Sequence, residues 1–274
     1  MQIEKKYASL PVISIVSMLV TYFLNHDLRL GAVIAASLVG LAAGFLFKNA
    51  LFAVASYSAA FVGMSSKALI PEWYFLIPAG LIHAIVVIAM MRVFTGWGGK
   101  AGTMGFTAVA LTSIILLFIE PVNYTQPNPL GMIASFPIDV WVVGIIAGVA
   151  GIMLTLIVRE KAHGGPRGND AVIGSATVAL IGGIVATTFS AAPFNYANFA
   201  FIAPIIASGT YAGMAARKVL PKTYDFLIVG VLLGVLNVAL WPIFPGFGGR
   251  LGTIGLISCA IWILIIKLRK PKAA

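Results

Sequence analysis

Ten apolar runs make up most of the sequence, and their lengths constrain the fold more than any other feature. A transmembrane helix needs about 20 mostly apolar residues, and each run reaches or approaches that length. The runs are 8–24, 31–47, 50–64, 74–94, 104–121, 137–158, 171–188, 199–214, 224–243 and 251–267. We therefore predict an all-α integral membrane protein of about ten transmembrane helices. The third and eighth runs are short for a full crossing and have polar or glycine flanks, which predicts short helices that are broken, partly unwound or re-entrant.

The composition agrees with a protein surrounded by lipid. Hydrophobic residues make up 60% of the chain and charged residues only 9%, whereas soluble domains carry about 25% charged residues. The 18 Lys and Arg against 8 Asp and Glu would suggest nucleic-acid binding in a soluble protein. Here the basic residues flank apolar runs and indicate membrane topology. We expect the lipid bilayer and a small solute or ion as partners and no nucleic acid; a homo-oligomer is left open.

The charges between the runs predict the orientation. Basic residues fall in segments 5–6, 159–167, 217–222 and 267–272, whereas segments 122–136 and 187–199 carry no charge. Because basic loops stay in the cytoplasm, ten spans place both termini there. The predicted location is the cell inner (plasma) membrane, as a multi-pass protein. The first run resembles a signal peptide, but no small-x-small cleavage motif follows it, so we interpret it as a retained helix.

An internal repeat divides the chain into two halves. Residues 63–105 align without gaps on residues 213–255 at a constant offset of 150. The matches include prolines, glycines and basic residues in non-apolar loops, which chance similarity between apolar helices does not explain. We predict a first five-helix repeat over 1–121, an external linker over 122–136 and a second five-helix repeat over 137–274. The longer loop around 191–198 absorbs a change to an offset of 139 upstream.

An odd number of spans in each half gives the two repeats inverted topology. Many secondary transporters use this plan, with the solute site near the midplane where the repeats meet. Inward-open and outward-open states then arise when the halves exchange conformations. The architecture supports alternating access, although channels share it.

The strongest local motif is a glycine-rich basic loop that occurs once in each half, at 94–103 and 244–253. Glycine permits close backbone approach, and successive amides with a following helix N-terminus favour an anion. The candidate substrate-binding or gating residues are Gly98, Gly99, Lys100, Thr103, Gly248, Gly249, Arg250 and Thr253. Two alternatives remain open: gating or re-entrant structure without solute contact, and plain helix packing.

Four polar residues are candidates for a site at mid-depth in the membrane. Polar and ionisable groups in a bilayer are expensive, so each is a site candidate. They are His83, Asn237, Ser58 and Ser208. For His83 the alternatives are proton relay or ligand contact and a neutral ring bonded to a neighbouring helix. For Asn237 the alternative is interhelical hydrogen bonding.

These features favour a membrane transport protein, a secondary transporter or facilitator for a small polar or anionic solute. An ion channel with glycine-rich gating loops on opposite faces is the alternative. A non-transporting subunit or an intramembrane enzyme is less favoured, because no metal-ligand pair, acid pair or nucleophile–histidine pair occurs at suitable spacing. We expect no enzyme activity, no cofactor and no metal site.

Overall fold

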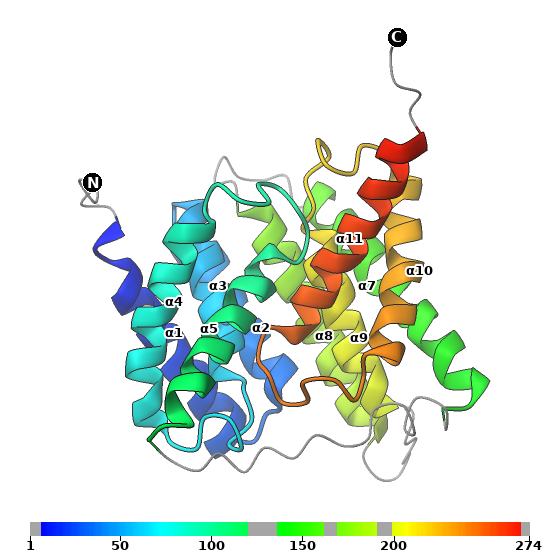
Figure 1. The fold of residues 1–274 in the computed structure, drawn as a ribbon. Coiled ribbons are helices and arrows are strands. Elements are labelled where there is room, and N and C mark those ends of the chain that lie inside the picture. The colour runs from blue at the N-terminus through cyan, green and yellow to red at the C-terminus, as the bar shows by residue number, and fades with distance from the viewer. Residues whose placement is uncertain (1–6, 120–135, 162–168, 191–198, 270–274) are drawn as a thin grey trace.

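The computed structural model describes residues 7–119, 136–161, 169–190 and 199–269, and this part of the chain folds into ten α-helices with no strand (Figure 1). The helices are α1 (Leu10–Tyr22), α2 (Ala32–Leu46), α3 (Ala50–Gly63), α4 (Leu76–Met90), α5 (Lys100–Leu116), α7 (Ile138–Lys161), α8 (Asp170–Ser190), α9 (Phe199–Gly213), α10 (Thr223–Ala239) and α11 (Arg250–Arg269). A π-helical segment, Phe23–Asp27, extends α1. The predicted linker 122–136 and the loop 191–198 lie, apart from residue 136, outside the described residues.

The helices have the composition of a membrane protein. Five of them are long and apolar enough to cross a membrane, and five are shorter apolar helices of 10–17 residues. Large apolar side chains point outward on several helices; Ile85 and Ile146 are 67% and 62% exposed. Such outward faces suit lipid, and helices satisfy their own backbone hydrogen bonds there. The chain is therefore an α-helical protein with the character of a membrane protein.

The predicted short helices are found, but the predicted break inside them is wrong. Helices α3 and α9 are short and continuous through the hydroxyl-rich segments 56–58 and 208–211. Serine hydroxyls in these segments bond to neighbouring helices, and the backbone of both helices stays helical. Ser58 Oγ donates to the Ala101 carbonyl at 2.7 Å, and Ser208 Oγ donates to the Leu251 carbonyl at 2.7 Å.

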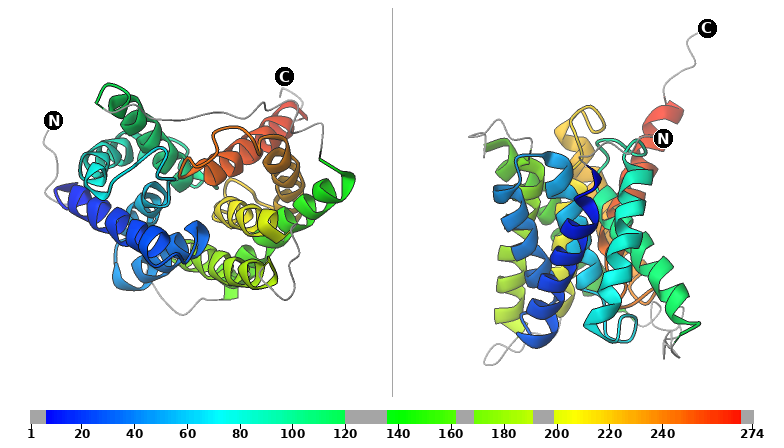
Figure 2. Two further views of the ribbon diagram at one scale, coloured as in Figure 1. Left: turned by 90° about the horizontal axis from the view of Figure 1, so that it is seen from below. Right: turned by 90° about the vertical axis from the view of Figure 1, so that its left-hand side faces the viewer.

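Each half forms its own group of helices, and the two groups lie side by side (Figure 2). In the first group α3 packs on α1, α2 and α5, and α4 packs on α1 and α5. In the second group α9 packs on α7, α8 and α11, and α10 packs on α7 and α11. The groups meet mainly along α2 with α8 and α5 with α11.

Both pairs at this interface are antiparallel. Gly44 of α2 lies against Ile173 of α8, and Gly183 of α8 lies against Ile34 of α2. In Figure 1, α5 descends from the end that holds both chain termini, whereas α11 rises from the opposite end. The site described below is built on this second pair.

Candidate functional site

The two glycine-rich loops have the same backbone conformation. Positive φ angles occur at Phe94 (51°), Gly96 (80°) and Gly99 (80°) in the first loop. In the second loop they recur 150 residues later, at Phe244, Gly246 and Gly249, with angles of 52°, 78° and 83°. Glycine adopts positive φ without the steric cost that a Cβ brings. The repeated glycines therefore preserve one loop shape in both halves.

Each loop docks on the other half of the molecule. The Ala216 amide donates to the Gly96 carbonyl at 2.8 Å, and the Ser66 amide donates to the Gly246 carbonyl at 3.0 Å. These two bonds are again related by the offset of 150. The Gly99 amide adds a bond of 2.8 Å to the Tyr211 carbonyl. The loops therefore hold the two groups of helices together from opposite ends.

The backbones of α5 and α11 touch where the loops end. A Cβ added to Gly102 would lie 2.4 Å from the Gly252 Cα, and one added to Gly99 would lie 2.2 Å from the Gly252 carbonyl oxygen. Gly98 has the same property, because its Cβ would lie 2.1 Å from the Ala212 carbonyl oxygen. These glycines pack against backbone, which supports the packing role left open by the sequence.

The remaining glycines and threonines among the candidates also have structural roles. A Cβ on Gly248 would collide with the Phe61 carbonyl, and one on Gly249 would lie 2.2 Å from the Gly102 carbonyl oxygen. Thr103 and Thr253 donate their hydroxyls to the carbonyls of Gly99 and Gly249, at 3.3 Å and 3.2 Å. Helices α5 and α11 begin at residues 100 and 250, four residues and one residue before the predicted runs 104–121 and 251–267.

Lys100 and Arg250 make equivalent bonds to the preceding helix end of their own half. Lys100 Nζ donates to the Met91 carbonyl at 3.0 Å. Arg250 donates to the Trp241 carbonyl at 2.7 Å and also lies over the Trp241 ring, 5.4 Å from its centroid. Cations at carbonyl ends of helices are electrostatically favourable. The two basic residues have matched positions, but their surroundings differ.

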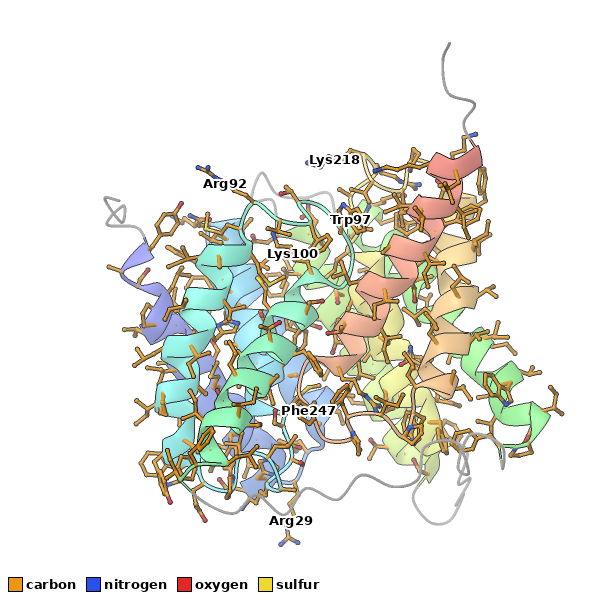
Figure 3. The ribbon with its side chains drawn as sticks, in the orientation of Figure 1. Arg29, Arg92, Trp97, Lys100, Lys218 and Phe247 are labelled. Carbon is orange, nitrogen blue, oxygen red and sulfur yellow. The ribbon has the colours of Figure 1, made fainter. Side chains whose placement is uncertain are left out.

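A cavity of about 420 Å³ opens beside Lys100. Met91, Trp97, Met104 and Met214 line it with other apolar side chains, and Lys100 is the one charged residue among the described residues of its lining. Residues of the second half, Ala171 and Met214, complete the wall, so the cavity lies between the halves. Figure 3 places Trp97 and Lys100 near the end that also carries Arg92 and Lys218.

A second, charged pocket adjoins this cavity. It has a volume of about 370 Å³ and shares Ala171 and Met214 with the first. Its charged lining residues are Arg159, Glu160, Asp170 and Arg217. Arg217 and Glu160 form a salt bridge at 2.7 Å. A charged pocket and a largely apolar cavity therefore lie next to each other and share two lining residues.

Three aromatic rings pack together beside the second glycine-rich loop. Phe106 packs on Phe244 and Phe247 with ring centroids 5.6 Å and 5.5 Å apart, and those two rings lie 5.3 Å from each other. At an offset of 150, Phe106 corresponds to Leu256, which has no ring. Figure 3 shows Phe247 toward the end opposite Lys218. The structure is therefore asymmetric about its two loops.

The four mid-depth candidates form two hydrogen-bonded sets. His83 is fully buried, and its two ring nitrogens lie 2.8 Å from the hydroxyls of Ser14 and Ser58. In the second half Asn237 Nδ2 donates to Ser208 Oγ at 3.0 Å. Ser58 and Ser208 then bind the first turns of α5 and α11. This geometry supports the packing interpretation for His83 and Asn237.

We expect His83→Leu to lower the free energy of unfolding by about 1–3 kcal/mol, because the buried hydroxyls of Ser14 and Ser58 lose their ring partner. Thermal or chemical unfolding of the purified protein in detergent measures the loss. If the ring only packs, the conservative variant His83→Gln retains the pH profile of any solute-dependent stabilisation. If the pH dependence is lost in His83→Gln, the result supports the proton-relay hypothesis for His83.

Sequence reasoning missed several buried polar residues. Asp225, 1% exposed, accepts hydrogen bonds from the Trp262 indole at 3.0 Å and the Lys222 amide at 2.8 Å. Its position in the first turn of α10 was the signal for a capping role. Ser37 and Ser175 lie fully buried at the interface of the halves, and nothing in their local sequence marks them. In the described part of the chain no three His, Cys, Asp or Glu side chains gather as metal ligands.

Comparison with protein-family models, curated proteins and solved structures finds no match for this chain. A function therefore has to follow from the chemistry of its own residues.

Proposed function

We propose that the chain is a membrane transport protein, a secondary transporter or facilitator, that carries a small anionic solute between two inverted repeats, 1–121 and 137–274. One observation carries this proposal: the two glycine-rich loops start from opposite ends of the molecule and meet at Gly102 and Gly252. A pseudo-two-fold axis between them would lie in the membrane plane, as in inverted-repeat transporters.

Three pairs of hydrogen bonds at the offset of 150 support the inverted repeat. The pairs are Ala216–Gly96 with Ser66–Gly246, Ser58–Ala101 with Ser208–Leu251, and Lys100–Met91 with Arg250–Trp241. The helices also pack in the same order within each half. Antiparallel contacts of α2 with α8 and of α5 with α11 are those expected where equivalent helices face each other across a two-fold axis.

The unequal packing beside the two loops supports alternating access. A cavity lies beside Lys100, whereas Trp241, the counterpart of its lining residue Met91, packs its ring on Phe201 with centroids 4.5 Å apart. In a two-fold transporter, an exchange of conformations between the halves closes the first region and opens the second. The structure then represents the state open toward the end that carries Arg92 and Lys218.

The lining of the cavity supports an anion with an apolar body as the solute. Lys100 supplies one positive charge, and its ammonium has three donors with one hydrogen bond, to Met91, in the described structure. Met104, Met214 and Trp97 offer apolar surface around it. Thioether side chains adapt to irregular ligands, so a small carboxylate with a hydrocarbon portion suits the chamber.

The distribution of basic residues supports a cytoplasmic position for the end with the cavity. That end carries Arg92 and Lys218, and the opposite end carries Arg29 (Figure 3). Most of the basic loops seen in the sequence connect helices at the first end, which the positive-inside rule assigns to the cytoplasm. Insertion in the inner membrane with both termini cytoplasmic follows from the same rule.

Labelling from the two sides of the membrane tests the inverted topology. Phe94 and Phe244 are a matched pair, 38% and 41% exposed, and each is replaced by Cys in a Cys259→Ala background. We expect an impermeant maleimide to modify Phe94→Cys only in inside-out vesicles and Phe244→Cys only in right-side-out vesicles. Modification of both from one side would overturn the inverted repeat.

Anion-dependent stability tests the function, with Arg250 as the matched control. We expect sodium carboxylates from acetate to octanoate, at constant ionic strength, to raise the Tm of the purified protein. Lys100→Gln should weaken the apparent affinity at least tenfold, about 1.4 kcal/mol. Arg250→Gln should retain it, because Arg250 lies on the Trp241 ring beside the closed region. Equal stabilisation of the wild type and Lys100→Gln would reject the anion role of Lys100.

A further inference from the structure

Three of the cavity residues lie one helical turn above buried hydroxyl groups. Val54 of α3, Ala171 of α8 and Met214, which directly follows α9, line the cavity. Positions three or four residues apart share one face of a helix. One turn deeper, the same faces carry Tyr57, Ser175 and the pair Thr210–Tyr211. The floor of the cavity therefore stands directly over a layer of hydroxyls contributed by both halves.

Five fully buried side chains form this layer, which we name the hydroxyl cluster: Ser37 of α2, Tyr57 of α3, Ser175 of α8, and Thr210 and Tyr211 of α9. Tyr57 Oη lies 3.4 Å from Ser175 Oγ, and Ser175 Oγ donates to Thr210 Oγ1 at 3.1 Å. Ser37 lies one turn from Gly40, which packs on the Tyr57 ring, and the Tyr211 ring lies 5.8 Å from the Tyr57 ring. Four helices, two from each half, thus converge on one polar point.

The hydroxyl cluster is not fully hydrogen-bonded. Ser37 Oγ and Tyr211 Oη are buried without a hydrogen bond of normal geometry to any described group. Unsatisfied buried hydroxyls are costly, and a native structure that contains them calls for an explanation. A ligand placed between Ser37 and Tyr211 would accept their unused O–H groups. The rings of Tyr57, Phe61 and Tyr211, with centroids 4.6–5.8 Å apart, stack beside this point.

The charges around the cluster favour an anion over a cation. Helices α2, α3 and α9 contain no Asp, Glu, Lys or Arg, and α8 contains only Asp170, at its first residue. The nearest charge in the cavity above is Lys100. The N-cap residue of α5, Gly99, binds the Tyr211 carbonyl, so the positive end of that helix dipole also lies beside the cluster.

We propose that the hydroxyl cluster is the site where a small monovalent anion, stripped of water, is held on its path through the protein. This inference rests on the proposed transport function. Lys100 attracts the anion into the cavity, and the hydroxyls replace its hydration shell one turn deeper. Hydroxyl donors without a full positive charge bind an anion weakly enough to release it, which conduction or transport requires.

Bromide binding tests the site, with Ser113 as the matched control. Ser113 carries another buried hydroxyl without a partner among the described residues, on α5 and outside the cluster. The purified protein is titrated with sodium bromide against sodium gluconate at constant ionic strength, and Tm is recorded. We expect bromide to stabilise the wild type, Tyr211→Phe to raise the apparent Kd at least tenfold, and Ser113→Ala to leave it unchanged.

Ser37→Ala provides a second test in case Tyr211→Phe does not fold, and it should weaken bromide binding by a similar factor. Unchanged bromide affinity in the cluster variants would overturn the site, whether or not Lys100→Gln weakens carboxylate binding. Absence of any bromide effect on the wild type would also overturn it. The proposed function fails separately, if carboxylates neither stabilise the protein nor cross proteoliposome membranes.

Discussion

Gly99→Ala and Gly249→Ala are each expected to lower the free energy of unfolding by about 2–5 kcal/mol. Both glycines have φ near +80°, a conformation that costs an L-residue about 1–2 kcal/mol. Each added Cβ would also lie 2.2 Å from a carbonyl oxygen of the facing helix. Backbone atoms cannot rotate away, so overpacking adds about 1–3 kcal/mol. Unfolding in detergent by heat or by a chemical denaturant measures the loss.

Gly31→Ala is the matched control for the two loop variants. Gly31 has φ +89°, but nothing lies within 4 Å of its added Cβ. With ψ 147° its backbone lies in a region that essentially only glycine adopts, so the variant carries backbone strain without the collision, and we expect a loss of about 1–3 kcal/mol. Equal losses for Gly31→Ala and Gly99→Ala would show that α5 and α11 do not touch as described, and the contact that carries the inverted repeat would be lost.

The helices themselves were predictable, because lipid imposes length and apolarity on each span. Run 50–64 became α3, Ala50–Gly63, and run 199–214 became α9, Phe199–Gly213. Boundaries at the glycine-rich loops were less accurate. Helix α5 begins at Lys100, because Gly99 at positive φ is its N-cap and the chain is already helical one residue later. Hydropathy alone does not detect such a helix start, since Lys100 and Gly102 lower the mean hydropathy of the first turn.

Only part of the candidate site could be predicted from the sequence. The repeat predicted Lys100 and Arg250 as equivalent positions, and both donate to a carbonyl at the end of the preceding helix. Their surroundings differ because positions outside the matched set differ: Phe106 in one half corresponds to Leu256 in the other. Whether a cavity forms depends on such packing. The hydroxyl cluster was hidden for a related reason, since Ser37 and Ser175 meet only through the long-range contact of α2 with α8.

A bulky side chain introduced into the cavity from a helix of the second half should stop transport without unfolding the protein. Ala171 lines both the cavity beside Lys100 and the charged pocket at its mouth, so Ala171→Trp places an indole at their junction. The open space accepts the ring, and the overpacking cost of a filled core does not apply. We expect the flux of a stabilising carboxylate into proteoliposomes to fall more than tenfold, with Tm changed by only a few degrees.

Ile85→Trp is the matched control for this blocking substitution. Ile85 lies on the outward face of α4 and is 67% exposed, so an indole there meets lipid and leaves the cavity empty. If both tryptophan variants transport as well as the wild type, the solute does not pass the space beside Ala171. The cavity is then no part of the transport pathway. Loss of flux in Ala171→Trp alone ties transport to the space beside Lys100. Loss of flux in both variants would indicate altered insertion of the protein into the membrane, because only the indole at position 171 reaches the cavity.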